Sequence, residues 1–289
     1  MMDWLVTGGG GLLGREVLSR LAADGVPARG LSRAELDITD RGAVLDAVAS
    51  ARPRVVVNCA AYTGVDAAEA DEAWATRVNG DGAAYLAEAC SAVGARLLHV
   101  STDYVFPGDA RVPYAEDAAP RPLNAYGRSK LAGERAVMEL LGPRASVVRT
   151  AWLYGRRGAS FVETMLRLQR EQEIVEVVDD LYGQPTWSAE VAARLILLGR
   201  LGLRDRRAGG VWHAAGSGHA SWFELAQEVF RLVGADPRRV RAIGVAASPG
   251  PAPRPPYTVL GQGRWREAGL GPLPHWRTSL AEALAARQS

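Results

Sequence analysis

The sequence is poor in the residues that build metal and redox sites. Only two of its 289 residues are cysteines, Cys59 and Cys90, and they form no C-x-x-C motif. Both lie in apolar surroundings, so we expect them to be small core residues. The four histidines are scattered and lack the H-x-x-x-H spacing of zinc enzymes. Neither a catalytic zinc nor a cysteine redox site is therefore expected.

Long apolar runs and long blocks of one charge are missing as well. The chain is 48% hydrophobic and 23% charged, with a formal charge of +2, which is typical of a soluble globular protein. Its acidic and basic residues are interspersed, and this argues against a nucleic-acid partner. No segment resembles a signal peptide or a transmembrane span. We therefore expect a cytoplasmic protein with no membrane partner.

Glycine, by contrast, is concentrated near the amino terminus. An apolar run at residues 4–7 leads directly into glycines that include Gly8, Gly11 and Gly14, and residues 15–23 then carry apolar side chains at helical spacing. A glycine turn between a strand and a helix lets the backbone approach a pyrophosphate, which the helix N-terminus also attracts. The spacing differs from the G-x-G-x-x-G of many dehydrogenases. It still predicts a dinucleotide-binding turn.

The end of the next expected strand, residues 26–31, indicates the type of dinucleotide. An acidic residue at this position binds the adenosine ribose, but here the residues are Ser32 and Arg33. A hydroxyl and a guanidinium suit a 2′-phosphate better. NADPH is therefore the preferred cofactor and NADH the alternative, and a solvated loop is the other interpretation of Arg33. Asp40 is placed to cap a helix that begins near Arg41.

The alternation of strands and helices predicts the fold. Residues 55–61 have the pattern of a buried strand that runs into small residues, residues 73–93 that of a helix, and residues 96–101 that of the next strand. This order predicts an α/β protein with a Rossmann-type, doubly wound parallel sheet. We place the dinucleotide-binding domain at residues 1–150. A smaller, mixed α/β region at residues 151–289 is expected to bind mainly substrate, with some segments returning to the first domain.

A tyrosine and a lysine four residues apart form the candidate catalytic pair. On a helix, Tyr126 and Lys130 leave the same face one turn apart. A neighbouring ammonium favours the ionised phenol, so the pair is suited to proton transfer near neutral pH. Thr102 lies at the end of the strand expected at residues 96–101, and the carboxyl ends of parallel strands face the crevice beside the glycine turn. We therefore expect these three side chains to converge on one bound group.

Together these motifs resemble the extended short-chain dehydrogenase/reductase family, and more closely the dTDP-4-dehydrorhamnose reductases among the nucleotide-sugar 4-ketoreductases. The resemblance covers most of the chain in the expected order. Besides the glycine turn, Thr102, Tyr126 and Lys130, it is carried by residues 36–40 (LDITD), 58–63 (NCAAYT), 65–66 (VD), 101–106 (STDYVF), 122–127 (PLNAYG), 149–155 (RTAWLYG), 183–186 (GQPT) and 213–216 (HAAG).

The resemblance implies reduction of the C4 ketone of a dTDP-4-keto-6-deoxyhexose. Tyr126 would donate a proton to the developing alkoxide, Lys130 would lower the tyrosine pKa and bind the nicotinamide ribose, and Thr102 would hydrogen-bond the same oxygen. A plain core role for Trp152 and a turn-capping role for Asp37 are the alternatives to the contacts implied below. The implied cofactor contacts are Gly8, Gly11, Leu12, Leu13, Asp37, Ile38, Ala60, Ala61 and Tyr62, and the implied sugar contacts are Val65, Tyr104 and Trp152.

The carboxyl-terminal part carries further candidates. The proline-rich residues 248–257 are expected to form a substrate-facing loop in which Arg254 contacts a phosphate. Some relatives hold Mg²⁺ at a dimer interface through glutamates, so the resemblance also suggests a homodimer with an interface ion. Glu16, Glu190 and Glu282 fall near the matching places. Surface carboxylates on amphipathic helices are the alternative, and no other metal ligands are predicted.

Several functions remain open at this point. The same ketone reduction serves antibiotic deoxysugar pathways, such as dTDP-dihydrostreptose formation, and Ser160 and Gly261 depart from the usual asparagine and aspartate, which leaves the sugar open. A non-catalytic, dinucleotide-binding regulatory subunit also resembles this family, but retention of Thr102, Tyr126 and Lys130 argues against a pure binding role. Epimerases and dehydratases share these three residues, although the extra acid/base pair of a dehydratase is not recognisable here.

Overall fold

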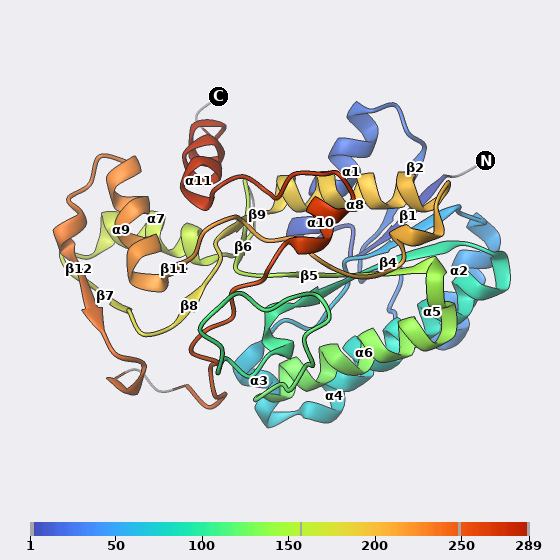
Figure 1. Ribbon diagram of the computed structural model, residues 1–289, viewed down its shortest axis with the longest axis horizontal. Helices are drawn as coiled ribbons and strands as arrows, with labels where there is room; N and C mark the ends of the chain where they lie inside the picture. Colours follow the sequence, from blue (N-terminus) through green and yellow to red (C-terminus); the bar gives the residue numbers. More distant parts are fainter. Residues whose placement is uncertain (1–2, 157, 248–249, 288–289) are drawn as a thin grey trace.

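A six-stranded sheet forms the larger part of the protein. The computed structural model describes residues 3–156, 158–247 and 250–287. Every neighbouring pair of strands in this sheet is parallel, in the order β10-β5-β4-β3-β1-β2 (Figure 1). The chain thus moves from β1 outward to β2 and then crosses to the other side of β1, which confirms the predicted doubly wound Rossmann-type fold. The strands are β1 (Trp4–Thr7), β2 (Ala28–Leu31), β3 (Val55–Asn58), β4 (Arg96–Thr102), β5 (Ala145–Thr150) and β10 (Gly210–His213).

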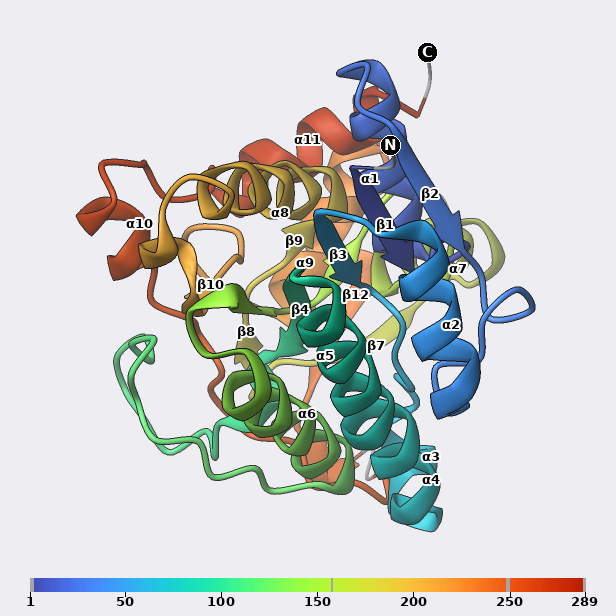
Figure 2. The ribbon, with the colours of Figure 1, turned by 90° about the vertical axis from the view of Figure 1, so that its right-hand side faces the viewer.

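Helices cover both faces of the sheet (Figure 2). Alternate residues of β1 enter different cores, Trp4 and Val6 on one face and Leu5 on the other. This alternation follows from the two-residue period of a strand. The helices α1 (Leu12–Ala23) and α8 (Ser188–Gly202) pack together on one face, and α2 (Arg41–Ala51), α5 (Gly82–Val93) and α6 (Ala125–Leu141) cover the other.

A smaller region lies at the carboxyl ends of the sheet strands and has a core of its own. It contains three two-stranded sheets, formed by β7 with β12, β8 with β11, and β6 with β9. The chain returns to the large sheet through α8 and β10. The elements of the smaller region are β6 (Leu153–Tyr154), α7 (Phe161–Glu171), β7 (Val175–Val178), β8 (Tyr182–Gly183), β9 (Thr186–Trp187), β11 (Ala220–Ser221), α9 (Trp222–Leu232), β12 (Val240–Ile243) and α11 (Trp276–Ala285), whereas α10 (Gly263–Glu267) packs beside β10 on the large sheet.

The helix predicted at residues 73–93 is interrupted in the structure. After α3 (Val65–Ala70), the chain forms α4 (Glu72–Thr76), then a π-helical turn at Arg77–Asp81, and only then α5. Apolar periodicity does not reveal such a turn, because it adds a single residue to an otherwise helical pattern. The cap predicted for α2 is confirmed, since the Asp40 carboxylate accepts a hydrogen bond from the N–H of Ala43 at 3.0 Å.

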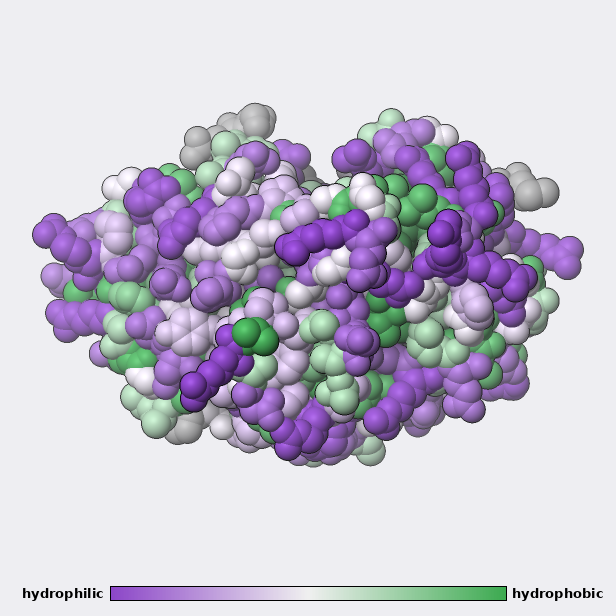
Figure 3. Space-filling view, viewed as in Figure 1, coloured by the Kyte–Doolittle hydropathy of each residue, from purple (hydrophilic) through white to green (hydrophobic). Residues whose placement is uncertain are grey.

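The surface, the hydropathy of the helices and the two cysteines can be compared with the sequence predictions. The face shown in Figure 3 mixes hydrophilic and hydrophobic residues. Within the described residues, no helix combines the length and hydropathy needed to cross a membrane. Cys90 is buried as predicted, but Cys59 is only half-buried and lines the cleft described below, because β3 ends there.

Candidate active site

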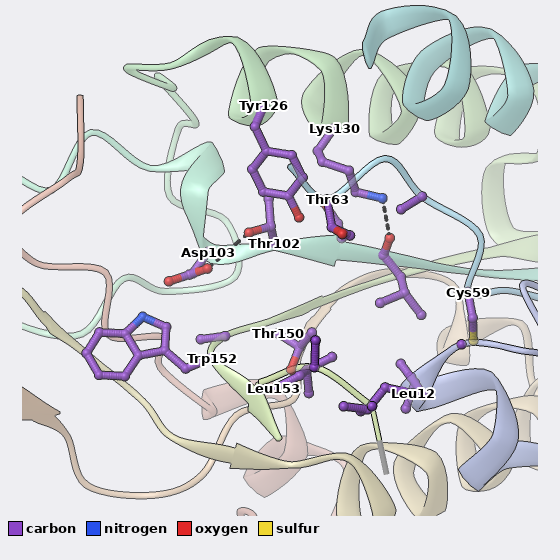
Figure 4. A pocket seen from close by; sticks show the side chains of 18 of the residues that line it. Leu12, Cys59, Thr63, Thr102, Asp103, Tyr126, Lys130, Thr150, Trp152 and Leu153 are labelled. Carbon is purple, nitrogen blue, oxygen red and sulfur yellow. Dashed lines mark hydrogen bonds between the residues drawn. The ribbon is translucent and has the colours of Figure 1, made fainter. Parts of the chain in front are cut away.

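A cleft of about 610 Å³ opens at the carboxyl ends of the central strands. It lies between the glycine turn, the end of β4, the first turns of α6 and the segment after β5 (Figure 4). Thr102, Tyr126 and Lys130 line it together with Leu12 and Trp152. Because side chains from four separate parts of the sequence meet here, this cleft is the candidate active site.

The glycine turn forms one wall of the cleft. Gly8 has a φ of 67°, and a Cβ there would lie 2.6 Å from the backbone nitrogen of Ala60. A Cβ on Gly14 would lie 2.3 Å from the carbonyl oxygen of Gly8, so both positions require glycine. No side chain caps the N-terminus of α1, which leaves its first backbone N–H groups at the cleft wall. This cradle fits the pyrophosphate of a dinucleotide.

A hollow of about 190 Å³ adjoins the turn at the expected adenosine end. The Asp37 carboxylate accepts hydrogen bonds from the N–H and the hydroxyl of Thr39, at 2.9 and 2.8 Å, and these bonds lower the pKa of Asp37. Asp37 therefore stabilises its own turn and also lines the hollow. The lining residues are Gly8, Gly11, Arg33, Leu36, Asp37, Ile38, Cys59, Ala60, Ala61, Tyr62 and Val78.

At the expected 2′-phosphate end, Ser32 and Arg33 have different surroundings. Both the N–H and the hydroxyl of Ser32 donate to the Glu35 carboxylate, at 2.8 and 2.7 Å, so Ser32 is already engaged. Arg33 shares an aromatic neighbour with a second arginine. Arg33 and Arg77 each lie 6.0 Å from the ring centroid of Trp74. Trp74 in α4 and Arg77 in the π-helical turn were not predicted, because they come close to Arg33 only in the folded chain.

Helix α6 presents the catalytic pair. Asn124 caps it by accepting a hydrogen bond from the N–H of Gly127 at 2.8 Å. A Cβ on Gly127 would lie 2.2 Å from the carbonyl oxygen of Tyr104, so a glycine lets α6 pack directly on the end of β4. As a result Tyr126 and Lys130 both point into the cleft, and the phenol lies over Thr102 (Figure 4). The structure thus brings the three predicted catalytic residues together.

The electrostatics of the pair differ from the prediction. Burial raises the pKa of Tyr126 to about 12, although the nearby Thr102 hydroxyl opposes the shift. Burial also lowers the pKa of Lys130 to about 8, and its ammonium donates to the carbonyl oxygen of Val100 at 2.7 Å. The prediction that Lys130 lowers the tyrosine pKa is therefore wrong for the protein alone, because desolvation of the phenol dominates.

Asp103 and Thr258 support Thr102 and were not predicted. The Thr102 hydroxyl donates to Asp103 at 3.0 Å, and the Thr258 hydroxyl donates to the other carboxylate oxygen at 2.5 Å. Burial raises the pKa of Asp103 to about 6. Asp103 belongs to the STDYVF segment, so the sequence contained a motif that could have indicated its role. Thr258 is far from Asp103 in the sequence, and no motif indicated that the two residues meet.

Asn79 connects the cofactor loop to the catalytic helix. Its side chain accepts from the N–H of Tyr62 at 2.9 Å and donates to the carbonyl oxygen of Tyr62 at 3.0 Å. It also donates to the hydroxyl of Ser129, between Tyr126 and Lys130, at 2.9 Å. The π-helical turn aims Asn79 at these partners, which is a common use of such turns.

The predicted sugar contacts are only partly assembled. Trp152 lines the cleft, and the ring of Tyr104 packs edge-on against Tyr126 at 6.0 Å between centroids. Arg254 forms an ion pair with Asp66 at 2.6 Å. Val65, Tyr104 and Arg254 are all described by the structure, and none of them lines the cleft. Their contacts with substrate remain predictions.

The three glutamates proposed for an interface ion do not form a metal site in this chain. Glu190 accepts a hydrogen bond from the Ser279 hydroxyl at 2.6 Å, and burial, with the nearby Glu282, raises the pKa of Glu190. Glu16 lies in a different hollow beside Arg15 and Arg156. No group of three or more potential ligands occurs among the described residues. Magnesium binding and a homodimer therefore stay predictions.

Comparison with known proteins places the chain in a family. Residues 2–289 match the family model described as the RmlD substrate binding domain. The chain belongs to this family. It is 53% identical over 283 residues to a dTDP-4-dehydrorhamnose reductase of Streptomyces griseus (98% of this chain, 93% of the relative). It is 50% identical over 280 residues to a dTDP-4-keto-6-deoxy-D-glucose reductase of Streptomyces niveus (97% and 96%). The resemblance drawn from the motifs is confirmed.

Solved structures of this family have the same fold. The dTDP-4-dehydrorhamnose reductase of Bacillus anthracis, solved in complex with NADP, superposes with a TM-score of 0.94 at 35% identity. The superposition covers 99% of this chain and 100% of that one. The large sheet and the smaller region therefore occur together in an NADP-binding relative.

Proposed function

We propose that the protein is an NADPH-dependent oxidoreductase that reduces the C4 ketone of a dTDP-4-keto-6-deoxyhexose, most simply dTDP-4-dehydrorhamnose to dTDP-L-rhamnose. The observation that carries this proposal is the convergence of Thr102, Tyr126 and Lys130 on one cleft beside the glycine turn. The names of the Streptomyces relatives support the substrate class.

Each of the three residues has a role that its environment supports. A bound nicotinamide would supply the hydride to the ketone carbon. Tyr126, with a pKa of about 12, is protonated at neutral pH and is suited to donate its proton to the ketone oxygen. Lys130, with a pKa of about 8, is mainly cationic at neutral pH and offsets the negative charge left on the phenol. Thr102 would hold the same oxygen once its single hydroxyl proton turns from Asp103 toward the bound sugar.

The preference for NADPH rests on the paired guanidiniums of Arg33 and Arg77. Arg33 lines the adenosine hollow, where it could hydrogen-bond a 2′-phosphate, and guanidinium–phosphate hydrogen bonds are among the strong ones. Both arginines contribute to the lowered pKa of Asp37 in that hollow, so Arg77 would add positive charge at the same end. Ser32 is not part of this proposal, because Glu35 occupies both of its donors. NADH, which lacks the phosphate, would gain nothing from either arginine.

The same chemistry on a different sugar is the second candidate. The relative from Streptomyces niveus is named for dTDP-4-keto-6-deoxy-D-glucose, at an identity close to that of the rhamnose-pathway relative. An antibiotic deoxysugar pathway would use the same proton donor and cofactor. A purely regulatory dinucleotide-binding subunit is disfavoured by the assembled Thr102, Tyr126 and Lys130.

Turnover followed by product identification tests the proposal. Purified protein is mixed with enzymatically generated dTDP-4-dehydrorhamnose and either NADPH or NADH, and cofactor oxidation is followed by absorbance. We expect oxidation with NADPH and a product identified by NMR as dTDP-L-rhamnose. A different reduced sugar would favour the antibiotic-pathway alternative, and no turnover with either cofactor or with dTDP-4-keto-6-deoxy-D-glucose would contradict the proposal.

A further inference from the structure

Trp152 is held in an unusual backbone conformation at the substrate end of the cleft. Its φ is 42°, a left-handed value that bulky residues rarely adopt. Such a conformation persists only where surrounding contacts compensate for it, and it is concentrated at functional sites. Its side chain lines the cleft beyond Thr102 and Asp103, at the far end from Leu12 (Figure 4). The contacts that hold this indole are therefore of functional interest.

Trp222 supplies the largest of these contacts. The indoles of Trp152 and Trp222 are stacked, with ring centroids 3.5 Å apart and an interplanar angle of 8°. Phe161, the first residue of α7, packs against Trp222 at 4.6 Å between centroids. Trp222 therefore contacts both Trp152 and Phe161. At this separation and angle the faces of the two indoles are in direct van der Waals contact, so Trp222 restrains the indole of Trp152 by packing.

The small β8–β11 sheet places Trp222 beside Trp152. Ala220 pairs with Gly183 and Ser221 pairs with Tyr182, so Trp222 begins α9 directly after the sheet. Ser221 and Glu224 form a capping box that fixes this first turn. On the same sheet, Gly183 leaves room for the indole, since a Cβ there would lie 2.4 Å from Cε2 of Trp152.

We infer that Trp222 is a positioning residue for substrate, acting through Trp152. The stack fixes the orientation of an indole that forms the wall of the cleft next to Thr102 and Tyr126. The flat faces of sugars pack well on such rings, so the fixed indole would orient the hexose with its ketone toward Tyr126. This inference rests on the proposed function, because it assigns the hexose to this end of the cleft.

Kinetics of Trp222 variants test the inference. Trp222→Leu removes the ring, and we expect KM for the keto sugar to rise roughly 2- to 10-fold, the fold-change of an aromatic contact. The dissociation constant for NADPH and kcat should change little, as expected for loss of uniform binding. Trp222→Phe retains a ring and should restore most of the affinity. Phe223→Leu, on the same helix but outside the stack, is the matched control.

A double-mutant cycle distinguishes positioning from a merely structural role. In a Trp152→Ala background, Trp222→Leu should raise KM no further. Close indoles also give exciton signals in far-ultraviolet circular dichroism, and either single variant should remove the same component of the spectrum while that of the Trp212–Trp265 pair remains. If Trp222→Leu does not fold, Trp222→Met, which is unbranched and lacks a ring, replaces it. Equal KM values for Trp222→Leu and Phe223→Leu, or an undiminished effect in the Trp152→Ala background, would overturn the inference.

Binding without turnover separates this inference from the proposed function. Calorimetric binding of dTDP-L-rhamnose is expected to weaken in Trp222→Leu by the same factor as KM. Failure of the wild-type protein to reduce the keto sugar, with this binding difference intact, would count against the proposed function alone. Normal reduction with identical binding by the two proteins would count against the inference alone.

Discussion

At the glycine-turn end of the cleft, the key groups come from short motifs in which the spacing itself sets the geometry, whereas at the Trp152 end they come from distant segments. Gly8 and Gly14 lie six residues apart across the junction of β1 and α1, and Tyr126 and Lys130 belong to one helical turn. Trp152 is instead held by Trp222 and Gly183, and Thr258 reaches Asp103 from near the carboxyl terminus. The residues at the glycine-turn end are therefore suited to a dinucleotide and to one proton transfer. The geometry of the Trp152 end depends on how the smaller region packs.

Removing the proton donor should give the largest effect, and it should be confined to chemistry. Tyr126→Phe is expected to lower the single-turnover rate by roughly 10²-fold or more, the scale of general acid catalysis, with little change in NADPH binding by calorimetry. Arg54→Ala, which lies outside the cleft lining, is the control and should leave the single-turnover rate nearly unchanged. Near-normal turnover by the phenylalanine variant would remove Tyr126 from the mechanism.

Removing the paired guanidiniums should alter the cofactor preference and not the reaction. The double variant Arg33→Ala, Arg77→Ala is expected to weaken NADPH binding roughly 10- to 100-fold, the range for hydrogen bonds to charged groups, and to leave NADH binding nearly unchanged. Fluorescence titration of both cofactors measures this. Arg54→Ala lies at the amino end of β3, away from the cleft, and serves as the control. Equal weakening for both cofactors would contradict a 2′-phosphate site.

Enlarging Gly183 should weaken binding of the keto sugar and leave cofactor binding unchanged. The added methyl group of Gly183→Ala would overlap the indole of Trp152, so KM for the keto sugar should rise roughly 2- to 10-fold while NADPH binding stays constant. Gly271→Ala adds a methyl group where no atom lies within 4 Å and should have no effect. Thermal unfolding of both variants distinguishes a local shift from a loss of stability. An unchanged KM would show that the position of Trp152 does not matter.

The pH profile gives the smallest effect and reports on Lys130. Its pKa is lowered to about 8, so it is cationic below this pH and neutral above it, whereas Tyr126, at about 12, remains protonated across the range. We expect kcat/KM to fall as the pH rises and to reach half its plateau near the pKa of Lys130 in the free enzyme. A profile that stays flat well above this pH would show that the lysine charge is not required.

What the sequence allowed us to predict follows the same division. The Rossmann-type fold, the glycine turn and the grouping of Thr102, Tyr126 and Lys130 were predictable because strand and helix periods fix where nearby residues point. Arg77, Asn79, Thr258 and Trp222 were not, because each meets its partner through tertiary packing or through a π-helical turn that leaves no periodic signal. The tyrosine pKa was predicted with the wrong sign because burial is a property of the folded chain.

Transfer of an isotopic label tests the central claim most directly. NADPH that carries deuterium at the transferable position of its nicotinamide is mixed with dTDP-4-dehydrorhamnose and the wild-type protein, and the product is analysed by NMR and mass spectrometry. We predict one deuterium at C4 of the sugar for every NADP⁺ released, with the hydroxyl proton drawn from solvent through Tyr126. Deuterium at another carbon, or label that returns to a retained cofactor as in an epimerase, would contradict the account.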